Sequence, residues 1–509
     1  MSEVEELAAR RQALADLRAA GTDPYPARVS RTHDAAQALA AYQTDTAEEE
    51  QPGVTVAGRM LTPRHMGKAS FVHLVDGSGK IQLYLQRDKL GDAQFDLFKS
   101  LHPGDFLWAT GPVFRTRTGE ITVKAQEIKL LAKALRPLPD KYHGVTDKEV
   151  RYRKRYLDLI ANRDDSFVRL MQRSKLVSTV RHWLEARGFV EVETPVLQPL
   201  YGGAHARPFT THFNALNEDL FLRIALELYH KRLLIGGVDK LFEIGRVFRN
   251  EGLSRKHNPE FTMLELYWAY ADYHDIMTLV ETLVSDAATS MFGRPEVKRD
   301  ESIIDLTPPW PRQTLREAIL QHSGIDFAVY PPGDEGDLAL LAAARARGAQ
   351  IPDGTPRGKL IDELLSTFVE SHLVSPVFLF DYPIELSPLA KTKANDPRLV
   401  ERFEAFAGGI EIANAFSELN DPLEQRRRFE AQARDRAAGD LEAQLLDEEF
   451  LEAMEHGMPP AGGLGIGIDR LAMFFTGADT IRDVILFPQL RREGVLERDD
   501  EPDGSGATC

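Results

Sequence analysis

The sequence predicts an α+β protein in which a small β-barrel of the OB type precedes a larger domain that mixes strands with helices. Residues 54–131 contain about five short runs of alternating apolar and polar residues, which is the size and rhythm of an OB-fold. From residue 167 onward, helical patterns alternate with strand patterns. A length of 509 residues exceeds what one hydrophobic core usually holds, so we expect several domains.

Composition and charge narrow the function classes. A chain that is 43% hydrophobic and 28% charged is typical of a globular protein. The formal net charge of -16 argues against a uniformly nucleic-acid-binding surface but permits local basic patches, since salt screens charges over about 10 Å. The single cysteine, Cys509, argues against an intrachain disulfide or a cysteine-based zinc site. The first residues lack a signal sequence and no apolar run could span a membrane, so we expect a cytoplasmic protein without a membrane partner.

Residues 1–50 are predicted to form a helical N-terminal extension. Leu7, Leu14 and Leu17 recur near helical spacing, and Gly21 and Pro24 end the pattern. The acidic stretch 44–53 marks a boundary, after which residues 51–140 form the predicted barrel.

One face of the barrel has the chemistry of a single-stranded nucleic-acid site. Phe71, His73, Gln82 and Tyr84 alternate along a predicted hairpin, and cations lie in the neighbouring loops. Aromatic residues on strands belong more often to a core, so these residues alone do not establish RNA binding.

Residues 141–165 form a predicted basic hinge. Arg151, Arg153, Lys154 and Arg155 are either solvated charges or contacts to an RNA backbone. The larger domain, 166–490, begins with a helix over 167–188 and a strand that contains Pro195. Residues 297–376 are interpreted as a mostly helical insertion, and residues 491–509 as a disordered acidic tail.

A charged hairpin, Phe242–Tyr267, is the strongest candidate site. Two alternating runs flank a polar loop, which indicates paired strands. Arg249 and Glu251 share one face, as do Glu265 and Tyr267, because residues two apart on a strand point the same way. Ionisable groups on one side of a sheet indicate the floor of a polar ligand site.

Three stretches in this order, GFVEVETPVL, FRNEG with HNPEFTMLE, and GLGIGIDR, resemble the three signature motifs of class II aminoacyl-tRNA synthetases. The closest resemblance is to class II lysyl-tRNA synthetases of the bacterial type, through stretches such as RYRKRYLDLI, ELYHKRLLIGG and IANAFSELND, and it covers Val54–Pro488. It implies an antiparallel sheet flanked by helices, an OB-fold anticodon-binding domain and a homodimer.

The resemblance implies a lysine-tRNA ligase, which forms lysyl-adenylate from ATP and L-lysine and then transfers lysine to the 3′ end of tRNA(Lys). Attack of a carboxylate on the α-phosphate needs positioning and positive charge, and no nucleophilic side chain. Arg249 and Arg470 are the implied catalytic residues, Arg249 between the two reactants and Arg470 on adenine and the γ-phosphate. The implied ATP-binding residues are Arg249, Glu251, His257, Asn258, Phe261, Glu404 and Arg470.

The resemblance also implies metal and substrate ligands. Glu404 and Glu411 would hold Mg²⁺, about three ions in all, because carboxylates facing a triphosphate need cations between them. The implied lysine ligands are Gly203, Glu227, Arg249, Glu265, Tyr267, Asn414, Phe416 and Glu418. Burying several carboxylates together is costly unless a cation joins them, so we expect the empty pocket to select a dication.

Within that pocket, Glu418 and Tyr267 are assigned to the ε-ammonium, and Glu227 and Glu265 mainly to the α-ammonium. On the barrel, Phe71, Gln82 and Glu127 are the implied anticodon-binding residues. The sequence departs from the family at three positions near the pocket, Leu226, Ile410 and Ala413.

Three alternatives remain open. An aspartate or asparagine ligase shares the architecture but needs a cationic side-chain pocket, against which Glu418 and Tyr267 argue. A lysyltransferase acting on protein should lack the barrel. A catalytically dead RNA-binding relative would not need Arg249, Arg470, Glu404 and Glu411.

Overall fold

The computed structural model describes residues 3–139, 144–299, 301–437 and 445–491. They fall into two compact units, Met1–Thr146 and Asp147–Cys509. In these described ranges no helix is long and apolar enough to cross a membrane. The predicted acidic tail and Cys509 lie outside the described residues, except for Arg491.

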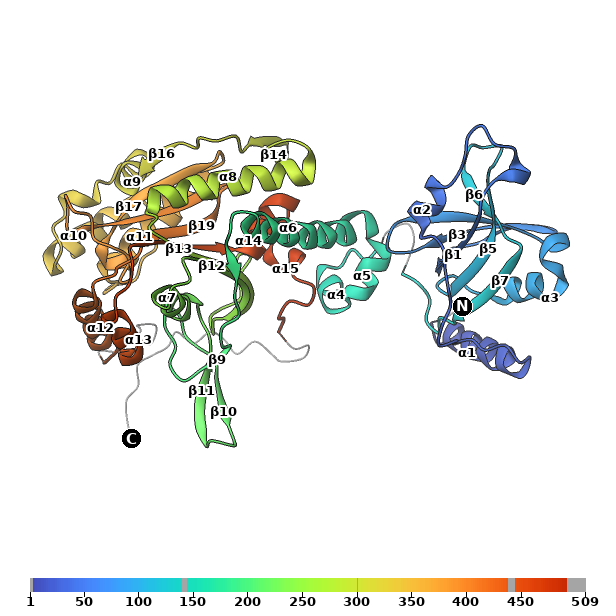
Figure 1. Ribbon diagram of the computed structural model, residues 1–509, viewed down its shortest axis with the longest axis horizontal. Coiled ribbons are helices and arrows are strands. Elements are labelled where there is room, and N and C mark those ends of the chain that lie inside the picture. The colour runs from blue at the N-terminus through green and yellow to red at the C-terminus, as the bar shows by residue number, and fades with distance from the viewer. Residues whose placement is uncertain (1–2, 140–143, 300, 438–444, 492–509) are drawn as a thin grey trace. The chain divides into compact units, whose positions relative to one another are not determined.

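The first unit contains a closed barrel, which confirms the predicted OB-type architecture (Figure 1). The strands pair in the order β1-β3-β4-β6-β5, and β5 pairs back to β1. β7 extends from β5 and β2 from β3. The strand bounds are β1 Gly53–Met60, β2 Arg64–Met66, β3 Ala69–Val75, β4 Lys80–Gln86, β5 Phe106–Arg115, β6 Ile121–Lys124 and β7 Glu127–Ala132.

Three helices complete this unit. The sequence pattern did not predict α3 (Arg87–Ser100), which follows β4 and buries Phe95 and Phe98. Helices α1 (Glu3–Ala19) and α2 (Ala35–Ala40) add Leu17 and two alanines to the same core. The N-terminal helices therefore help to stabilise the barrel.

The second unit is built on an eight-stranded sheet in the order β16-β17-β18-β19-β20-β13-β12-β8. Its six central strands are antiparallel, and β16 and β8 add parallel pairings at the two ends, so the predicted α+β class is confirmed. The bounds are β8 Val190–Glu191, β12 Lys240–Phe248, β13 Glu260–Ala269, β16 Arg312–Thr314, β17 Val377–Pro383, β18 Leu399–Ala407, β19 Ile410–Ser417 and β20 Ala461–Gly467.

Helices cover both faces of this sheet. On one face, α6 (Val168–Glu185), α8 (Tyr273–Phe292) and α14 (Ile468–Thr476) share the largest core with alternate residues of the central strands (Figure 1). On the other face, α7 (Glu227–Ile235), α12 (Pro422–Ala437) and α13 (Glu448–Glu455) pack against Leu241, Tyr267 and Ala269. The candidate site lies on this second face.

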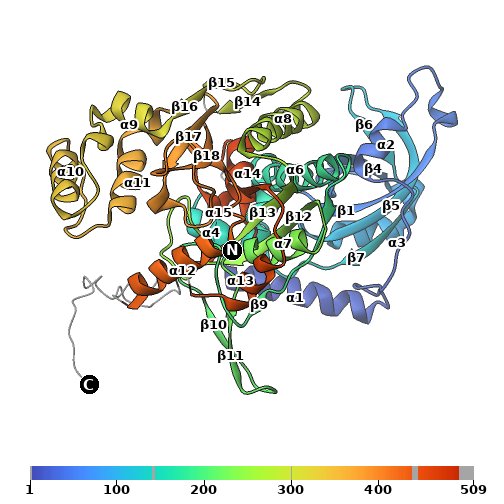
Figure 2. The same ribbon diagram turned by 60° about the vertical axis from the view of Figure 1, so that its left-hand side comes forward.

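Two segments differ from their sequence prediction. The strand expected at GFVEVETPVL is only two short strands, β8 and β9 (Leu197–Gln198), with Pro195 between them, because proline cannot donate to a ladder. The insertion holds the expected helices, α9 (Leu315–Ser323), α10 (Asp334–Ala346) and α11 (Arg357–Phe368), which share a core at one end of the sheet (Figure 2). It also contains the unpredicted strands β14 (Glu296–Arg299), β15 (Ser302–Asp305) and β16.

A smaller three-stranded sheet joins β9 to a hairpin, β10 (Thr210–Phe213) and β11 (Glu218–Leu222). Both views show this hairpin projecting away from the main sheet (Figures 1 and 2). Several of its apolar side chains are exposed, including Phe213 and Leu216.

The RNA interpretation of the basic hinge is wrong for Arg155. This residue begins α5 (Arg155–Ala161), which follows α4 (Lys148–Arg153), and it is only 1% exposed. Its guanidinium pairs with Asp158 at 2.7 Å and donates to the carbonyls of Arg482, Ile485 and Leu486, in and after α15 (Ile481–Val484). Arg155 therefore fastens α5 to a segment more than three hundred residues later.

Candidate active site

Adjacent strands of the main sheet carry the predicted ligands in two rows. In the first row, Glu404, Asn414, Gly465 and Glu265 are successive cross-strand partners on β18, β19, β20 and β13. In the second row, the partners are Arg402, Phe416, Gly463 and Tyr267. Cross-strand partners point to the same face, so residues from distant parts of the sequence form one floor.

The middle strand of this floor carries glycines, and one of them is required by its neighbours. A Cβ atom at Gly463 would lie 1.8 Å from Oε1 of Glu418 and 2.8 Å from Cε1 of Tyr267. No side chain fits there, so Gly463 lets the carboxylate and the ring approach the backbone. The sequence analysis singled out this motif for Arg470 and missed the glycine.

Three predicted lysine ligands are buried carboxylates, Glu227, Glu265 and Glu418. Burial, followed by the charge of Glu227, raises the pKa of Glu265 to about 8, although the backbone N–H of Leu226 donates to it at 3.1 Å. Burial and the same three acids raise the pKa of Tyr267 well above its ordinary value. The structure therefore brings the predicted acids and Tyr267 into mutual electrostatic contact.

Gly203 also lies at this cluster. Its φ of +86° is in the left-handed region, and a Cβ there would come within 3.0 Å of Cβ of both Ala225 and Glu227. The nearest carboxylate oxygen would be Oε2 of Glu227, at 3.7 Å. A larger residue at 203 would therefore displace Glu227.

Lys231 is a charged group of the cluster that the sequence analysis missed. It lies one turn after Glu227 on α7, is fully buried, and its Nζ is 2.6 Å from Glu227 Oε1 and 2.5 Å from Glu418 Oε2. Burial lowers the pKa of Lys231, but the two carboxylates outweigh burial and raise it. The buried acids of the empty pocket are therefore not without a cation, because Lys231 already joins two of them, and the expected selection of a dication stays a prediction.

Arg249 follows β12 and is anchored through its backbone and its side chain. Its N–H donates to the carbonyl of Pro259 at 2.8 Å, and Nε donates to the carbonyl of Ile224 at 3.3 Å. Its guanidinium carbon lies 5.3 Å from the centre of the Phe261 ring. Burial lowers its pKa, with Glu251 and Glu265 opposing, but a guanidinium still stays charged near neutral pH.

The hairpin loop places His257 beside Arg470. His257 Nε2 is 3.1 Å from an Nη atom of Arg470, and His257 Nδ1 is 2.8 Å from the Ser254 hydroxyl. Burial and then Arg470 lower the pKa of His257, so its imidazole is neutral at pH 7. Asn258 is buried, and its Nδ2 donates to the carbonyl of Glu260, whereas its Oδ1 has no protein partner. Arg249 is the cation over Phe261 in the structure, and binding of ATP by Phe261 and of adenine by Arg470 stay predictions.

Glu404 and Glu411 lie close enough to influence each other. Burial raises the pKa of Glu404 to about 7; Arg402, at 2.6 Å, opposes this, and the charges of Glu411 and Asp362 add to it. Glu411 pairs with Arg470 at 2.5 Å. Arg402 and Asp362 were not found from the sequence.

This donor set fits Mg²⁺ of the kind that uses one or two protein carboxylates together with phosphate oxygens and water. In the part of the chain that the structure describes, no group of three or more His, Cys, Asp or Glu side chains could hold an ion by itself. A metal here would therefore depend on oxygens from the nucleotide.

The three predicted anticodon residues lie on the barrel and differ in their contacts. Phe71 stacks on Tyr84 with ring centres 4.7 Å apart, and Glu127 pairs with Lys129 at 2.9 Å. Gln82 is only 2% exposed: its Nε2 donates to Glu120 at 2.8 Å and its Oε1 accepts from Thr122 at 2.9 Å. Gln82 would have to exchange these partners to read a base, and the three roles stay predictions.

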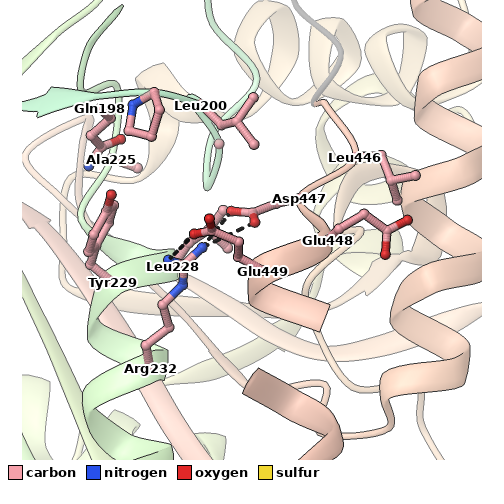
Figure 3. Close-up of a pocket in the computed structure, with 12 residues that line it drawn as sticks. Gln198, Leu200, Ala225, Leu228, Tyr229, Arg232, Leu446, Asp447, Glu448 and Glu449 are labelled. Carbon is pink, nitrogen blue, oxygen red and sulfur yellow. Dashed lines mark hydrogen bonds and ion pairs between the residues drawn. The ribbon is translucent and has the colours of Figure 1, made fainter. Parts of the chain in front are cut away.

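A pocket of about 240 Å³ lies beside the acid cluster, between α7 and the start of α13 (Figure 3). None of the predicted ligands lines it. Arg232 points across it to Asp447, at 2.9 Å, and Glu449, at 3.4 Å. Successive cations of α7 thus face different surroundings, since Lys231 is bound to the acid cluster.

Comparison with known proteins gives concordant matches over both units. The family model described as tRNA synthetases class II (D, K and N) matches residues 147–491, and the one described as OB-fold nucleic acid binding domain matches residues 54–131. The lysine–tRNA ligase of Bacillus subtilis (strain 168) is 50% identical, over 96% of this chain and 97% of its own length. Those of Moorella thermoacetica and Enterococcus faecalis are also 50% identical, over 96% of this chain and 98% and 97% of their own lengths.

Proposed function

The chain belongs to the class II tRNA synthetases of the D, K and N group, its activity is that of a lysine–tRNA ligase, and we propose that the residues described above carry that activity. The carboxylate of lysine attacks the α-phosphorus of ATP, pyrophosphate leaves, and lysyl-adenylate forms. A hydroxyl of the terminal ribose of the tRNA then attacks the acyl carbon, and AMP leaves.

The acid cluster supports the choice of lysine among the amino acids that this family uses. Glu227, Glu265 and Glu418 are three buried carboxyl groups, and Lys231 can neutralise only one of the charges that they carry when all three are ionised. An aspartate side chain would add a further negative charge, and burying an uncompensated charge costs several kcal/mol. The two ammonium groups of lysine would instead balance the two carboxylate charges that Lys231 leaves. The aspartate and asparagine alternatives are therefore disfavoured.

Arg249 is the residue that we assign to the reacting groups. Lysine's carboxylate and the α-phosphate repel each other, and a guanidinium between them would lower the barrier. Its anchoring to Pro259 and Ile224 pre-orients it, so little reorganisation is needed when the substrates bind.

Arg470 and the hairpin loop are the proposed ATP site. Arg470 pairs with Glu411 in the structure, so nucleotide binding would require that this pair be exchanged for phosphate contacts. The free Oδ1 of Asn258 offers an acceptor, Nε2 of His257 would become available if Arg470 turned to the nucleotide, and Glu251 remains exposed. Glu404 and Glu411 would hold Mg²⁺, which would neutralise charge on the phosphates as pyrophosphate leaves.

The proposal also covers tRNA binding, the location of the protein and its oligomeric state. We assign tRNA(Lys) anticodon binding to Phe71, Gln82 and Glu127 on the barrel, and we place the protein in the cytoplasm, where protein synthesis uses it. We also propose a homodimer, because the small sheet and the segments next to its strands expose five large apolar side chains: Val196, Leu197, Leu200, Phe213 and Leu216. Phe213→Asp should shift the molar mass measured by light scattering to that of one chain.

The test of the activity is ATP–pyrophosphate exchange without tRNA. L-lysine should support exchange, and aspartate and asparagine should not. Exchange supported by aspartate, or none with lysine in the presence of Mg²⁺, would contradict the proposal.

A further inference from the structure

Lys231 is placed to do more than neutralise charge. The two acids that it joins come from opposite sides of the cluster: Glu227 opens α7, and Glu418 follows the end of β19. These are the two acids assigned above to opposite ends of the substrate. One ammonium group in contact with both carboxylates limits how far apart they can lie.

Each acid uses one oxygen for Lys231 and turns the other elsewhere. Glu227 Oε1 contacts Lys231, while Oε2 lies 3.7 Å from the position that a Cβ at Gly203 would take. Glu418 Oε2 forms the ion pair with Lys231 at 2.5 Å, while Oε1 lies over Gly463; both oxygens are buried and neither has a hydrogen-bond partner. The contacts with Lys231 therefore orient the two remaining oxygens, which are the ones left for a ligand.

The lysine side chain is enclosed along its length. It is fully buried, extends from a helix, and its Nζ lies 5.7 Å from the centre of the Phe416 ring, which is assigned to the methylene chain of the substrate. An ammonium group with no exposed surface, paired with two carboxylates, favours one arrangement of those carboxylates.

We propose that Lys231 is a positioning residue that fixes the separation of the carboxylates of Glu227 and Glu418, and thereby makes the pocket discriminate diamino acids by chain length. This inference rests on the proposed function. A site that holds both ends of an extended ligand rejects a chain that is one methylene shorter, because one ammonium then loses its acceptor. If the bridge is removed, the carboxylates can adjust to the shorter ligand.

The inference has a specific alternative, in which Lys231 occupies the place of a substrate ammonium and must leave before lysine binds. The two ideas predict opposite results. A bridge that orients the acids makes lysine binding tighter, so its removal raises KM for lysine. A competing ammonium makes binding weaker, so its removal lowers KM.

The experiment measures ATP–pyrophosphate exchange with L-lysine and with L-ornithine for the wild type and Lys231→Met. We expect kcat/KM for lysine relative to ornithine to fall by about tenfold, the lower end of the discrimination that one methylene provides. KM for lysine should rise, and KM for ATP should stay unchanged. The ratio does not depend on how much of the variant folds, so partial misfolding cannot imitate the result.

Two further variants sharpen the test. Lys231→Gln keeps a hydrogen-bond donor, but its side chain is uncharged and can reach only one of the two acids. It should therefore shift the ratio in the same direction. Arg232→Met removes the next cation of α7, which points to Asp447 and Glu449, and should leave the ratio at the wild-type value. A ratio within twofold of wild type in both Lys231 variants, or a lower KM for lysine, would overturn the inference. If the wild type catalyses exchange with aspartate, or catalyses no exchange with any amino acid, the proposed function fails. If only the inference fails, lysine-dependent exchange by the wild type remains, so the two failures are distinguished.

Discussion

Glu418 occupies the space that a side chain at position 463 would fill. A Cβ there would lie 1.8 Å from its Oε1, and a real Cβ essentially never approaches a heavy atom that closely. The carboxylate that we assign to the substrate's ε-ammonium therefore depends on a residue with no side chain.

Gly463→Ala should accordingly remove most lysine activation. The methyl group must displace Glu418 or Tyr267, and overpacking of this kind costs about 1–3 kcal/mol. We expect KM for lysine in the exchange assay to rise by at least about tenfold, in keeping with that cost. Gly465→Ala is the better comparison, since the atom nearest to a Cβ at that position is the end of the Met263 side chain, at 3.2 Å. Gly457→Ala is unsuitable, because the φ of +101° at Gly457 would strain any side chain. Equal effects of the Gly463 and Gly465 substitutions would argue against the specific role of Glu418.

Arg249→Ala should abolish exchange without unfolding the protein. Loss of a group that stabilises developing charge lowers kcat by about 10²- to 10³-fold. Arg246→Ala is a matched control, because Arg246 lies on β12 three residues before Arg249, is partly exposed and is 3.7 Å from Glu260. An exchange rate in Arg249→Ala equal to that of the control would show that the assignment is wrong.

Lysine binding should release a proton. In the free protein the pKa of Glu265 is about 8, so at pH 7 its carboxyl is mostly protonated, and a bound ammonium favours the ionised form. Affinity for lysine should therefore rise with pH up to about 8, and calorimetry in buffers of different ionisation enthalpy should detect about one proton at pH 7. Glu265→Gln should remove this proton release; if the release persists in the variant, another group is responsible.

The same carboxyl has a linked effect on stability. Its folded-state pKa lies above its ordinary value, so the folded free protein holds the proton more tightly than the unfolded chain does. The contribution of this carboxyl to the free energy of unfolding is therefore present at low pH and is lost as pH rises through about 8.

Phe71→Ala should weaken tRNA binding but not amino acid activation. Stacking of a base on an aromatic ring contributes about 1–3 kcal/mol, so KM for tRNA in aminoacylation should rise about tenfold or more. Pyrophosphate exchange, measured without tRNA, should match the wild type. A parallel loss of exchange would indicate that Phe71 acts through folding.

Arg155→Met should destabilise the second unit. It would leave three backbone carbonyls without their donor and would break the ion pair with Asp158, and breaking a buried pair costs about 3–5 kcal/mol. Denaturant unfolding should show this loss. Lys154→Met, at the exposed neighbouring position, should change the unfolding free energy by less than about 0.5 kcal/mol.

Local patterns were sufficient to predict the barrel, the hairpin of Arg249 and Glu265, and the glycine-rich strand before Arg470. The hairpin and the glycine-rich strand are each encoded within about thirty residues, and the barrel is a succession of such short segments, in which strand alternation and turn residues are readable. The acids at 404, 411 and 418 were found only through family resemblance, since isolated glutamates read as surface charges.

What could not be predicted depends on cross-strand and helix-to-strand contacts. Lys231 in the run HKRLL has the pattern of an ordinary helix cation, and nothing nearby in sequence shows that Glu418 will meet it. Arg155 reads as one of four equivalent cations, although it alone is buried against residues 482–486. Gln82 has the alternation of an exposed face, but Glu120 and Thr122 enclose its amide.

Strand β20 has a consequence for how the protein is made. It lies between β19 and β13, so it is the only link in the strand order between the half-sheet β16–β19 and the half-sheet β13, β12 and β8. It is also the last strand to leave the ribosome among the described residues. Until then, a nascent chain carries two half-sheets with open edges, which are prone to pair with other chains. We therefore expect chaperone dependence during synthesis to end only when residues 461–467 have emerged.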